Sequence, residues 1–138
     1  MKPGVNEVPN VPAEKVFNAI LQSYAGEVVL VDVWAVWCGP CKDAHATLEP
    51  IKKDRLKDVT FVYLADNSSS RKDWEDAVAG IQGHHYYLTA EQKEVIFQRL
   101  EISAYPSYFL YGRDGKLLGK WTGFHKDEIL QTTDEALT

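Results

Sequence analysis

Two segments of the chain are almost continuously apolar and rich in β-branched residues: residues 28–34 and 59–65. Such runs are typical of strands that are buried on both faces of a sheet. Apolar residues recur at helical spacing elsewhere, which predicts helices. The expected helices run from Val16 to Tyr24, from the segment after Cys38 to about Leu56, from Ser70 through Val78, from Thr89 through Leu100, and from about Lys126 to Leu137.

The remaining pattern predicts three further strands, at residues 84–88, 107–111 and 116–122. Asp114-Gly115 between the last two is a strong hairpin signal. Helices alternate with strands in the first half of the chain, which favours parallel strands joined by right-handed crossovers. The expected fold class is therefore α/β, with a central mixed β-sheet flanked by helices on both faces.

The chain has 138 residues, which is enough for one domain with a single core. Residues 1–11 contain two prolines, a glycine and two asparagines, so we expect a tail or linker there, followed by one domain over residues 12–138. Pro50 lies inside the expected second helix. It should kink that helix or end it locally, because proline cannot donate the helical hydrogen bond.

Composition narrows the possible functions. The formal net charge of -5 argues against nucleic-acid binding, which requires a basic surface. No segment is apolar enough to predict a membrane span, and the N-terminus lacks the apolar run of a signal peptide. The chain is then either cytoplasmic or the mature part of a protein whose targeting segment or upstream domain was removed.

Cys38 and Cys41 are the only cysteines, and they lie at the turn between a buried strand and a helix. A Cys-x-x-Cys pair can close a disulfide between its own ends, and a helix N-terminus stabilises the thiolate of the first cysteine. Gly39 permits the tight turn, and Pro40 is pre-set for a first helical turn. The alternatives are an inert buried pair or half of a zinc site; the strand-turn-helix context favours redox chemistry.

In the redox interpretation, Cys38 is the more exposed thiol and attacks the disulfide of a partner. Cys41, one turn later and more buried, then attacks Cys38 and releases the reduced partner. This chemistry needs no dissociable cofactor.

The histidines allow a metal interpretation that the spacing does not favour. His45 follows Cys41 by one turn, and His84 and His85 are adjacent on an expected strand. Adjacent strand residues point to opposite faces, whereas structural zinc sites use spaced pairs. We therefore predict no metal site. The charged run of residues 52–55 is interpreted as a solvated helix face.

The segment from Val31 to Lys42 resembles the active-site segment of thioredoxin, with its aspartate, two tryptophans and Cys-Gly-Pro-Cys-Lys. Tyr105-Pro106 precedes a strand where proteins of the thioredoxin fold carry a cis-proline, and Thr122-Gly123 matches a glycine near the last strand. The helix-strand-helix insert at about residues 68–100 resembles the TlpA/ResA-like thiol-disulfide oxidoreductases.

The resemblance implies roles for residues around the cysteines. Asp32, a carboxylate within an apolar strand, would accept the proton of Cys41; the alternative is an aspartate on a wet strand face. Pro106 would follow a cis bond, and the backbone of Tyr105 would pair with an extended substrate. Trp37 would be a partly exposed contact for partners.

Trp34, the other tryptophan of the segment, is expected in the core. The resemblance to thioredoxin also implies a buried lysine near Asp32. No lysine stands near Val62, where thioredoxin would place it.

The resemblance also implies partners and a location. We expect a monomer that reduces protein disulfides, receives electrons from another dithiol protein, and works in the periplasm or cell envelope, with the cytoplasm as the alternative. A disulfide isomerase and a dedicated envelope reductase are alternatives within the class. A metal-handling module that uses the two thiolates, and a non-catalytic binding domain, are alternatives from other classes.

Overall fold

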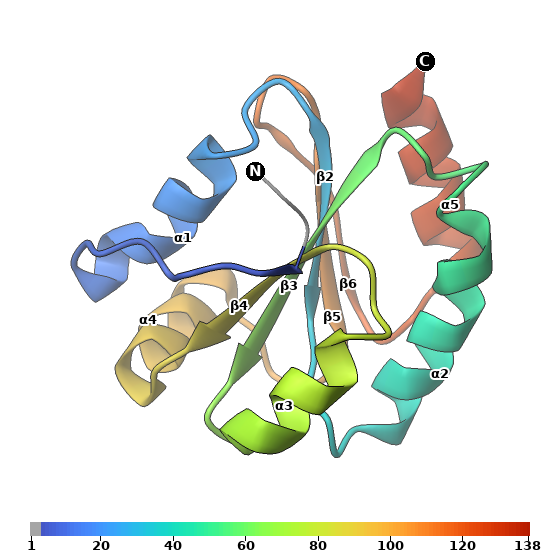
Figure 1. Cartoon of the computed structure of the whole chain (residues 1–138). Coiled ribbons are helices and arrows are strands. Elements are labelled where there is room, and N and C mark those ends of the chain that lie inside the picture. The colour runs from blue at the N-terminus through green and yellow to red at the C-terminus, as the bar shows by residue number, and fades with distance from the viewer. Residues whose placement is uncertain (1–3) are drawn as a thin grey trace.

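A six-stranded mixed sheet forms the centre of the computed structural model, which describes residues 4–138 (Figure 1). The strands are β1 (Gly4–Val5), β2 (Val28–Val33), β3 (Val59–Asp66), β4 (His84–Leu88), β5 (Ser107–Tyr111) and β6 (Leu117–Thr122). The helices are α1 (Ala13–Gln22), α2 (Gly39–Leu48), α3 (Arg71–Val78), α4 (Ala90–Leu100) and α5 (Lys126–Leu137), with a 3₁₀ turn, η1, at Glu49–Ile51.

The strand order is β1-β4-β3-β2-β5-β6. The first four strands in this order are mutually parallel, whereas β5 is antiparallel to β2 and β6 is antiparallel to β5. This arrangement confirms the mixed sheet that the alternation of helices and strands predicted, and it confirms the hairpin at Asp114-Gly115.

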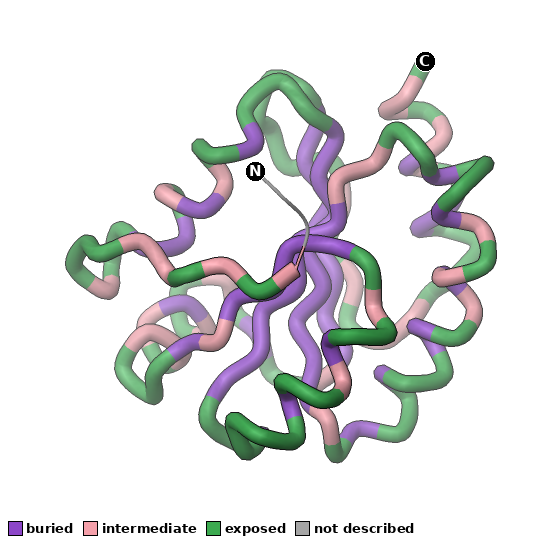
Figure 2. Tube along the Cα trace, in the orientation of Figure 1, coloured by how far each residue is buried: buried purple, intermediate pink, exposed green. Residues whose placement is uncertain are grey.

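Every residue of β2 is buried, because helices cover both faces of the sheet (Figures 1 and 2). Residues of α2, α3 and α5 pack into one hydrophobic cluster, and residues of α1 and α4 pack into the other. The near-continuous apolar sequence of β2 follows from this two-sided burial. The strand therefore delivers the segment that follows it, with both cysteines, to one end of a rigid sheet.

The helix after the cysteines is shorter than predicted. α2 ends at Leu48, and the chain continues through η1 into turns rather than reaching Leu56. Pro50 explains the difference, because its ring nitrogen cannot donate to a carbonyl in the preceding turn. The interpretation of residues 52–55 as a solvated helix face is wrong for Lys52, which is 7% exposed.

The expected tail contains a strand. Gly4–Val5 pairs in parallel with His84 and His85 at the outer edge of β4. A strand of two residues is too short to show a periodic pattern in the sequence. The pairing depends instead on the backbone groups of β4, which would otherwise be unpaired at the edge of the sheet. The rest of the predicted tail that precedes Gly4 lies outside the described residues.

The segment that resembled an insert folds as helix, strand and helix. Ser70 caps α3 by accepting a hydrogen bond from the Asp73 amide, and Thr89 and Gln92 form the capping box that opens α4. β4 joins the sheet between β1 and β3. Within residues 4–138, no helix combines the length and the apolar character that crossing a membrane requires.

Candidate active site

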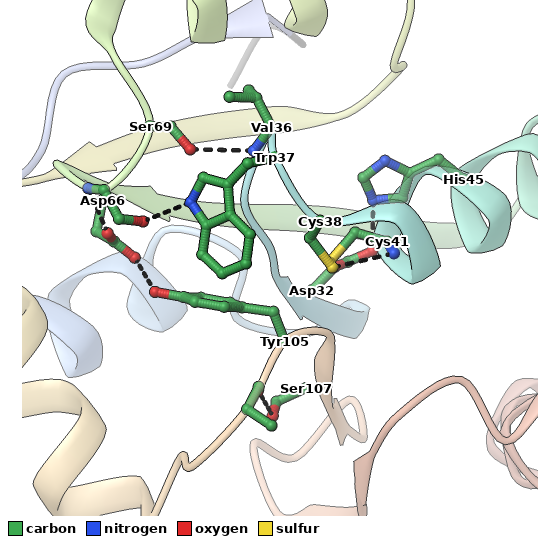
Figure 3. Close-up of a disulfide and its surroundings, with 12 residues drawn as sticks. Asp32, Val36, Trp37, Cys38, Cys41, His45, Asp66, Ser69, Tyr105 and Ser107 are labelled. Atoms are coloured by element: carbon green, nitrogen blue, oxygen red, sulfur yellow. Dashed lines mark hydrogen bonds and ion pairs between the residues drawn. A yellow bond between two sulfur atoms is a disulfide. The ribbon is translucent and has the colours of Figure 1, made fainter.

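A disulfide joins Cys38 and Cys41 at the N-terminus of α2 (Figure 3). Cys38 is the N-cap residue, and its sulfur accepts a hydrogen bond from the Cys41 amide at 3.2 Å. Gly39 and Pro40 form the start of the helix, where the missing N–H of proline costs no helical hydrogen bond. The strand-turn-helix arrangement that the sequence predicted for the two cysteines is confirmed.

The helix N-terminus gives the two sulfurs different surroundings. The Cys38 sulfur receives an amide hydrogen bond and the positive end of the helix dipole, both of which stabilise a thiolate. Cys38 is 4% exposed and Cys41 is 0% exposed. The predicted order of exposure is confirmed, although both cysteines are more buried than a freely accessible thiol.

The two tryptophans before the cysteines have opposite environments, as predicted. Trp34 is 1% exposed in the core, and Trp37 is 59% exposed beside the disulfide. The Trp37 indole nitrogen donates to the Ser68 hydroxyl at 3.2 Å, and its ring meets the Tyr105 ring edge-to-face at 5.3 Å. Trp37 is therefore an apolar surface that is held in place rather than a loose side chain.

The loop before β5 reaches the same site from far along the chain. The Tyr105–Pro106 peptide bond is cis, as the resemblance implied. The Tyr105 hydroxyl donates to Asp66 Oδ2, and the Ser107 hydroxyl donates to the Ala104 carbonyl at 2.7 Å. Burial is the larger cause that raises the pKa of Tyr105, and the hydrogen bond to Asp66 raises it further. The hydroxyl therefore remains a donor at neutral pH.

Asp66 connects the two loops of the site, and sequence reasoning missed it. This carboxylate is 1% exposed at the end of β3, and it accepts hydrogen bonds from the Tyr105 hydroxyl and from the Ser68 amide at 2.8 Å. Ser68 in turn holds Trp37. The available signal was an aspartate that ends a buried strand just before a run of polar residues.

A groove of about 440 Å³ opens next to Trp37 and Tyr105. Its other walls come from α4 and from the loop before Pro106, and the residues that line it are Lys93, Phe97, Ile102, Ser103 and Ala104. The helix-strand-helix segment thus contributes a wall beside the disulfide. This wall is largely apolar, with one lysine.

Asp32 is buried beneath the start of α2, so the alternative of a wet strand face is wrong. It lies between Tyr63 of β3 and Tyr108 of β5 in the register of the sheet. Its Oδ2 atom is 3.0 Å from Nε2 of His45, which is also buried. Figure 3 shows the carboxylate directed toward both the disulfide and the imidazole.

The other histidines lie apart from the cysteines. His84 packs on Tyr24 in the cluster beneath α1, whereas His85 stacks on Tyr63 in the opposite cluster. The prediction that they point to opposite faces is confirmed. Burial lowers the pKa of His85 to about 4. Within the described part of the chain, no three histidine, cysteine or carboxylate side chains gather as metal ligands would.

A buried lysine reaches this region from an unexpected element. Lys52, just after η1, donates to the Tyr63 hydroxyl and the Gln82 carbonyl, both at 2.6 Å, and to Glu49 at 2.9 Å. Burial lowers the pKa of Lys52, while Glu49 and the more distant Asp32 oppose that shift. A buried lysine thus lies on this face of the sheet, although it comes from the segment after η1 and not from β3.

Comparison with known proteins gives a consistent result. A model of the thioredoxin-like domain family matches residues 19–137. Thioredoxin of Mycobacterium tuberculosis is 53% identical over 36 residues, which is 26% of this chain and 31% of that protein. Thiol:disulfide interchange protein CycY of Rhizobium leguminosarum is 29% identical over 101 residues, 71% of this chain and 51% of that protein. The chain thus matches about half or less of the length of these relatives.

Solved structures extend the comparison to most of the chain. The exposed lipoprotein thioredoxin Etrx1 of Streptococcus pneumoniae is 25% identical, with a TM-score of 0.64 over 83% of this chain and 89% of that one. The thioredoxin domain of thiol-disulfide oxidoreductase BVU-2223 from Bacteroides vulgatus is 20% identical and shares the fold, with a TM-score of 0.69 over 86% and 84% of the two chains. Because the family model covers most of its length and the fold agrees, this chain belongs to the thioredoxin-like domain family.

Proposed function

We propose that the protein is a thiol-disulfide oxidoreductase that reduces protein disulfides through Cys38 and Cys41. The observation that carries this proposal is the disulfide at the N-terminus of α2, beside the exposed Trp37. A pair in this position can exchange two electrons with a partner. Membership of the family, and relatives whose names describe thiol-disulfide interchange, support the same activity.

The reaction begins with the reduced dithiol. The Cys38 thiolate attacks one sulfur of the partner's disulfide, and the other sulfur leaves as a thiolate. Cys41 then loses its proton and attacks the Cys38 sulfur of this mixed disulfide. The second partner thiolate leaves with its electron pair, so the partner gains two electrons while Cys38 and Cys41 become the disulfide.

Asp32 accepts the Cys41 proton in this proposal. Its burial beneath α2 and the direction of its carboxylate in Figure 3 support the assignment. A group that holds a proton briefly must lie close to the thiol and away from bulk water. Asp32 is 1% exposed, which supports the second condition, and its contact with His45 of α2 supports a position under the helix that carries Cys41.

The partner's chain lies across the two loops of the site. An extended segment pairs with the backbone of Tyr105, Pro106 presents a compact ring without an N–H, and Trp37 supplies an apolar contact. The fixed positions of Trp37 and Tyr105 support this mode of docking, because little side-chain entropy is lost when a partner binds.

A dithiol protein supplies the electrons, and the chain works as a monomer in the cell envelope. The name of Etrx1, an exposed lipoprotein thioredoxin, supports that location. The Cys-Gly-Pro-Cys sequence favours a reductant. A measured potential near the value of about −120 mV known for the oxidant DsbA would contradict the reducing direction.

A trapping experiment tests the proposal. In Cys41→Ser, Cys38 should form mixed disulfides with protein partners that cannot be resolved, visible as higher-mass bands on non-reducing gels that reductant removes. The matched control, Cys38→Ser, retains one thiol but should trap nothing. Trapping by Cys38→Ser instead, or by neither variant, would show that Cys38 is not the nucleophile.

A further inference from the structure

The mechanism above uses Asp32 but not His45, the buried histidine that is paired with it. The two side chains are 7% and 1% exposed, and His45 Nε2 lies 3.0 Å from Asp32 Oδ2. An ionised carboxylate has no proton to donate, so the hydrogen in this contact is on the imidazole nitrogen. When Asp32 is ionised, an Nε2–H of His45 donates to Oδ2, and the contact remains possible after Asp32 takes up a proton at Oδ1.

The position of His45 places this pair beneath the resolving cysteine. Cys41 and His45 are four residues apart on α2, so they share the helix face that packs on the sheet, and both are buried. Asp32 comes up from β2 to meet that face. Figure 3 shows the contact from its carboxylate to the imidazole of His45.

The two oxygens of Asp32 have different surroundings. Oδ2 is bound by His45, whereas Oδ1 is buried and forms no hydrogen bond of ordinary geometry among residues 4–138, although the Tyr108 hydroxyl lies close enough to interact with the carboxylate. An unpaired buried carboxylate oxygen is costly, and it is the natural acceptor for a proton from a neighbouring thiol. The imidazole thus fixes which oxygen is left for the reaction.

Other titratable groups surround Asp32 without replacing His45. Tyr63 and Tyr108 flank it on the neighbouring strands. Burial raises the pKa of both and the charge of Asp32 raises it further, so they stay neutral, and the Tyr108 hydroxyl is placed to donate to the carboxylate. Asp32 acts on Lys52 and His85 from a distance, where its negative charge opposes the burial that lowers the pKa of both. The Lys52 ammonium already binds three other partners, one of which is the carboxylate of Glu49.

We propose that His45 is a positioning residue for the resolving step, an inference that rests on the proposed function. It holds Oδ2 of Asp32 so that Oδ1 faces the Cys41 thiol. The Cys41 proton passes to Oδ1, the Cys41 sulfur bonds to the Cys38 sulfur, and the bond from Cys38 to the partner breaks with its electron pair on the leaving sulfur. Asp32 later returns the proton to solvent.

The two steps can be timed separately with Ellman's reagent as the disulfide substrate of the reduced protein. Attack by Cys38 releases the first equivalent of coloured thiolate, and resolution by Cys41 releases the second. In His45→Ala, the second phase should slow by about tenfold or more, while the first phase changes by less than about twofold; a proton-transfer group itself contributes about 10²–10⁴-fold, and His45 only positions one. His45→Gln, which restores an N–H donor, should recover much of the second rate.

Three further variants make the result specific. Asp32→Asn should slow the second phase, and adding His45→Ala to it should slow that phase no further, because the two residues act as one unit. His84→Ala removes a buried imidazole from the opposite face of the sheet and should leave the ratio of the two phases unchanged. Circular dichroism verifies the fold of each variant.

The outcomes separate this inference from the proposed function. The wild-type protein could show two phases while the second-phase rate is the same in wild type, His45→Ala and His45→Gln. That result would overturn the role of His45 but leave the proposed oxidoreductase activity standing. Equal slowing of both phases in His45→Ala would also overturn it, because that pattern indicates general structural damage. Absence of thiolate release by the wild-type protein would instead contradict the proposed function.

Discussion

Asp66 determines how the parts of the site are held together, although it lies one strand away from the cysteines. Its buried carboxylate accepts from Tyr105 and from the Ser68 amide, and the Ser68 hydroxyl accepts from Trp37. Trp37 and Tyr105 also touch each other. A single acidic side chain thus links the two aromatic residues beside the disulfide.

Removing only the Tyr105 hydroxyl tests this connection. Tyr105→Phe keeps the ring contacts with Trp37 and Phe97 but removes a hydrogen bond to a buried carboxylate. We expect the free energy of unfolding of the oxidised protein to fall by about 1–3 kcal/mol, because hydrogen bonds to charged groups contribute on this scale. Urea unfolding followed by circular dichroism measures the change.

Tyr111→Phe is the matched control. Its hydroxyl lies outside the Asp66 network, so the free energy of unfolding should change by less than about 1 kcal/mol. If the two variants lost the same stability, the hydrogen bond to Asp66 would not be the cause.

At the level of elements, short local signals set where the helices begin and end. Pro50 ends the α2 segment earlier than its apolar pattern suggested, and the resulting turns bring Lys52 inward. Thr89 and Gln92 start α4 with reciprocal hydrogen bonds of 3.1 and 3.0 Å. α4 carries Lys93 and Phe97 of the groove, so its start affects the wall beside the disulfide.

The capping box gives a prediction for this element. Thr89→Ala removes the side-chain acceptor of the Gln92 amide and should lower the free energy of unfolding by about 0.5–2 kcal/mol. Thr89→Ser restores a hydroxyl acceptor and should retain most of the wild-type value. Thermal and urea unfolding compare the three proteins. Equal stability of Thr89→Ala and wild type would mean that tertiary packing alone starts α4.

Across the whole molecule, a row of polar and aromatic residues crosses the sheet on the face beneath α2. Tyr108, Asp32, Tyr63 and His85 are neighbours in register on β5, β2, β3 and β4. His85 closes this row, stacked on Tyr63, and its Nε2 lies 2.7 Å from the Ile81 carbonyl. Burial of His85 links its protonation to the folding of the whole domain.

The lowered pKa of His85 predicts acid sensitivity. In the folded protein its pKa is about 4, whereas an unfolded histidine has a pKa of about 6.5, so the unfolded state binds more protons between these values. Stability therefore falls as pH drops through this window, by up to about 3 kcal/mol at pH 4 from this residue. Urea unfolding at pH 7, 5.5 and 4.5 measures the slope.

Two variants isolate the contribution of His85. His85→Gln cannot be protonated, so its stability should depend less on pH between about 6.5 and 4, even if it is less stable at pH 7. His125→Gln removes an exposed histidine and should keep the wild-type slope. An unchanged slope in His85→Gln would assign the acid sensitivity to other groups.

The sequence alone determined the features that depend on short segments. The apolar runs predicted the central strands, the helical spacing predicted the helices, and Cys38 and Cys41 predicted the dithiol at the start of α2. Local periodicity and a three-residue separation carry this information, because the relevant contacts form within one element or one turn. The match to the family segment around the cysteines has the same local basis.

Tertiary structure alone decided which distant side chains meet. His45 is 13 residues from Asp32, and Tyr105 is 39 residues from Asp66, so neither pair shares an element or a periodic pattern. The burial of Lys52 and the pairing of Gly4–Val5 likewise depend on neighbours brought close by the sheet. The chain thus encodes the reactive disulfide locally, whereas the folded sheet assembles the side chains that surround it.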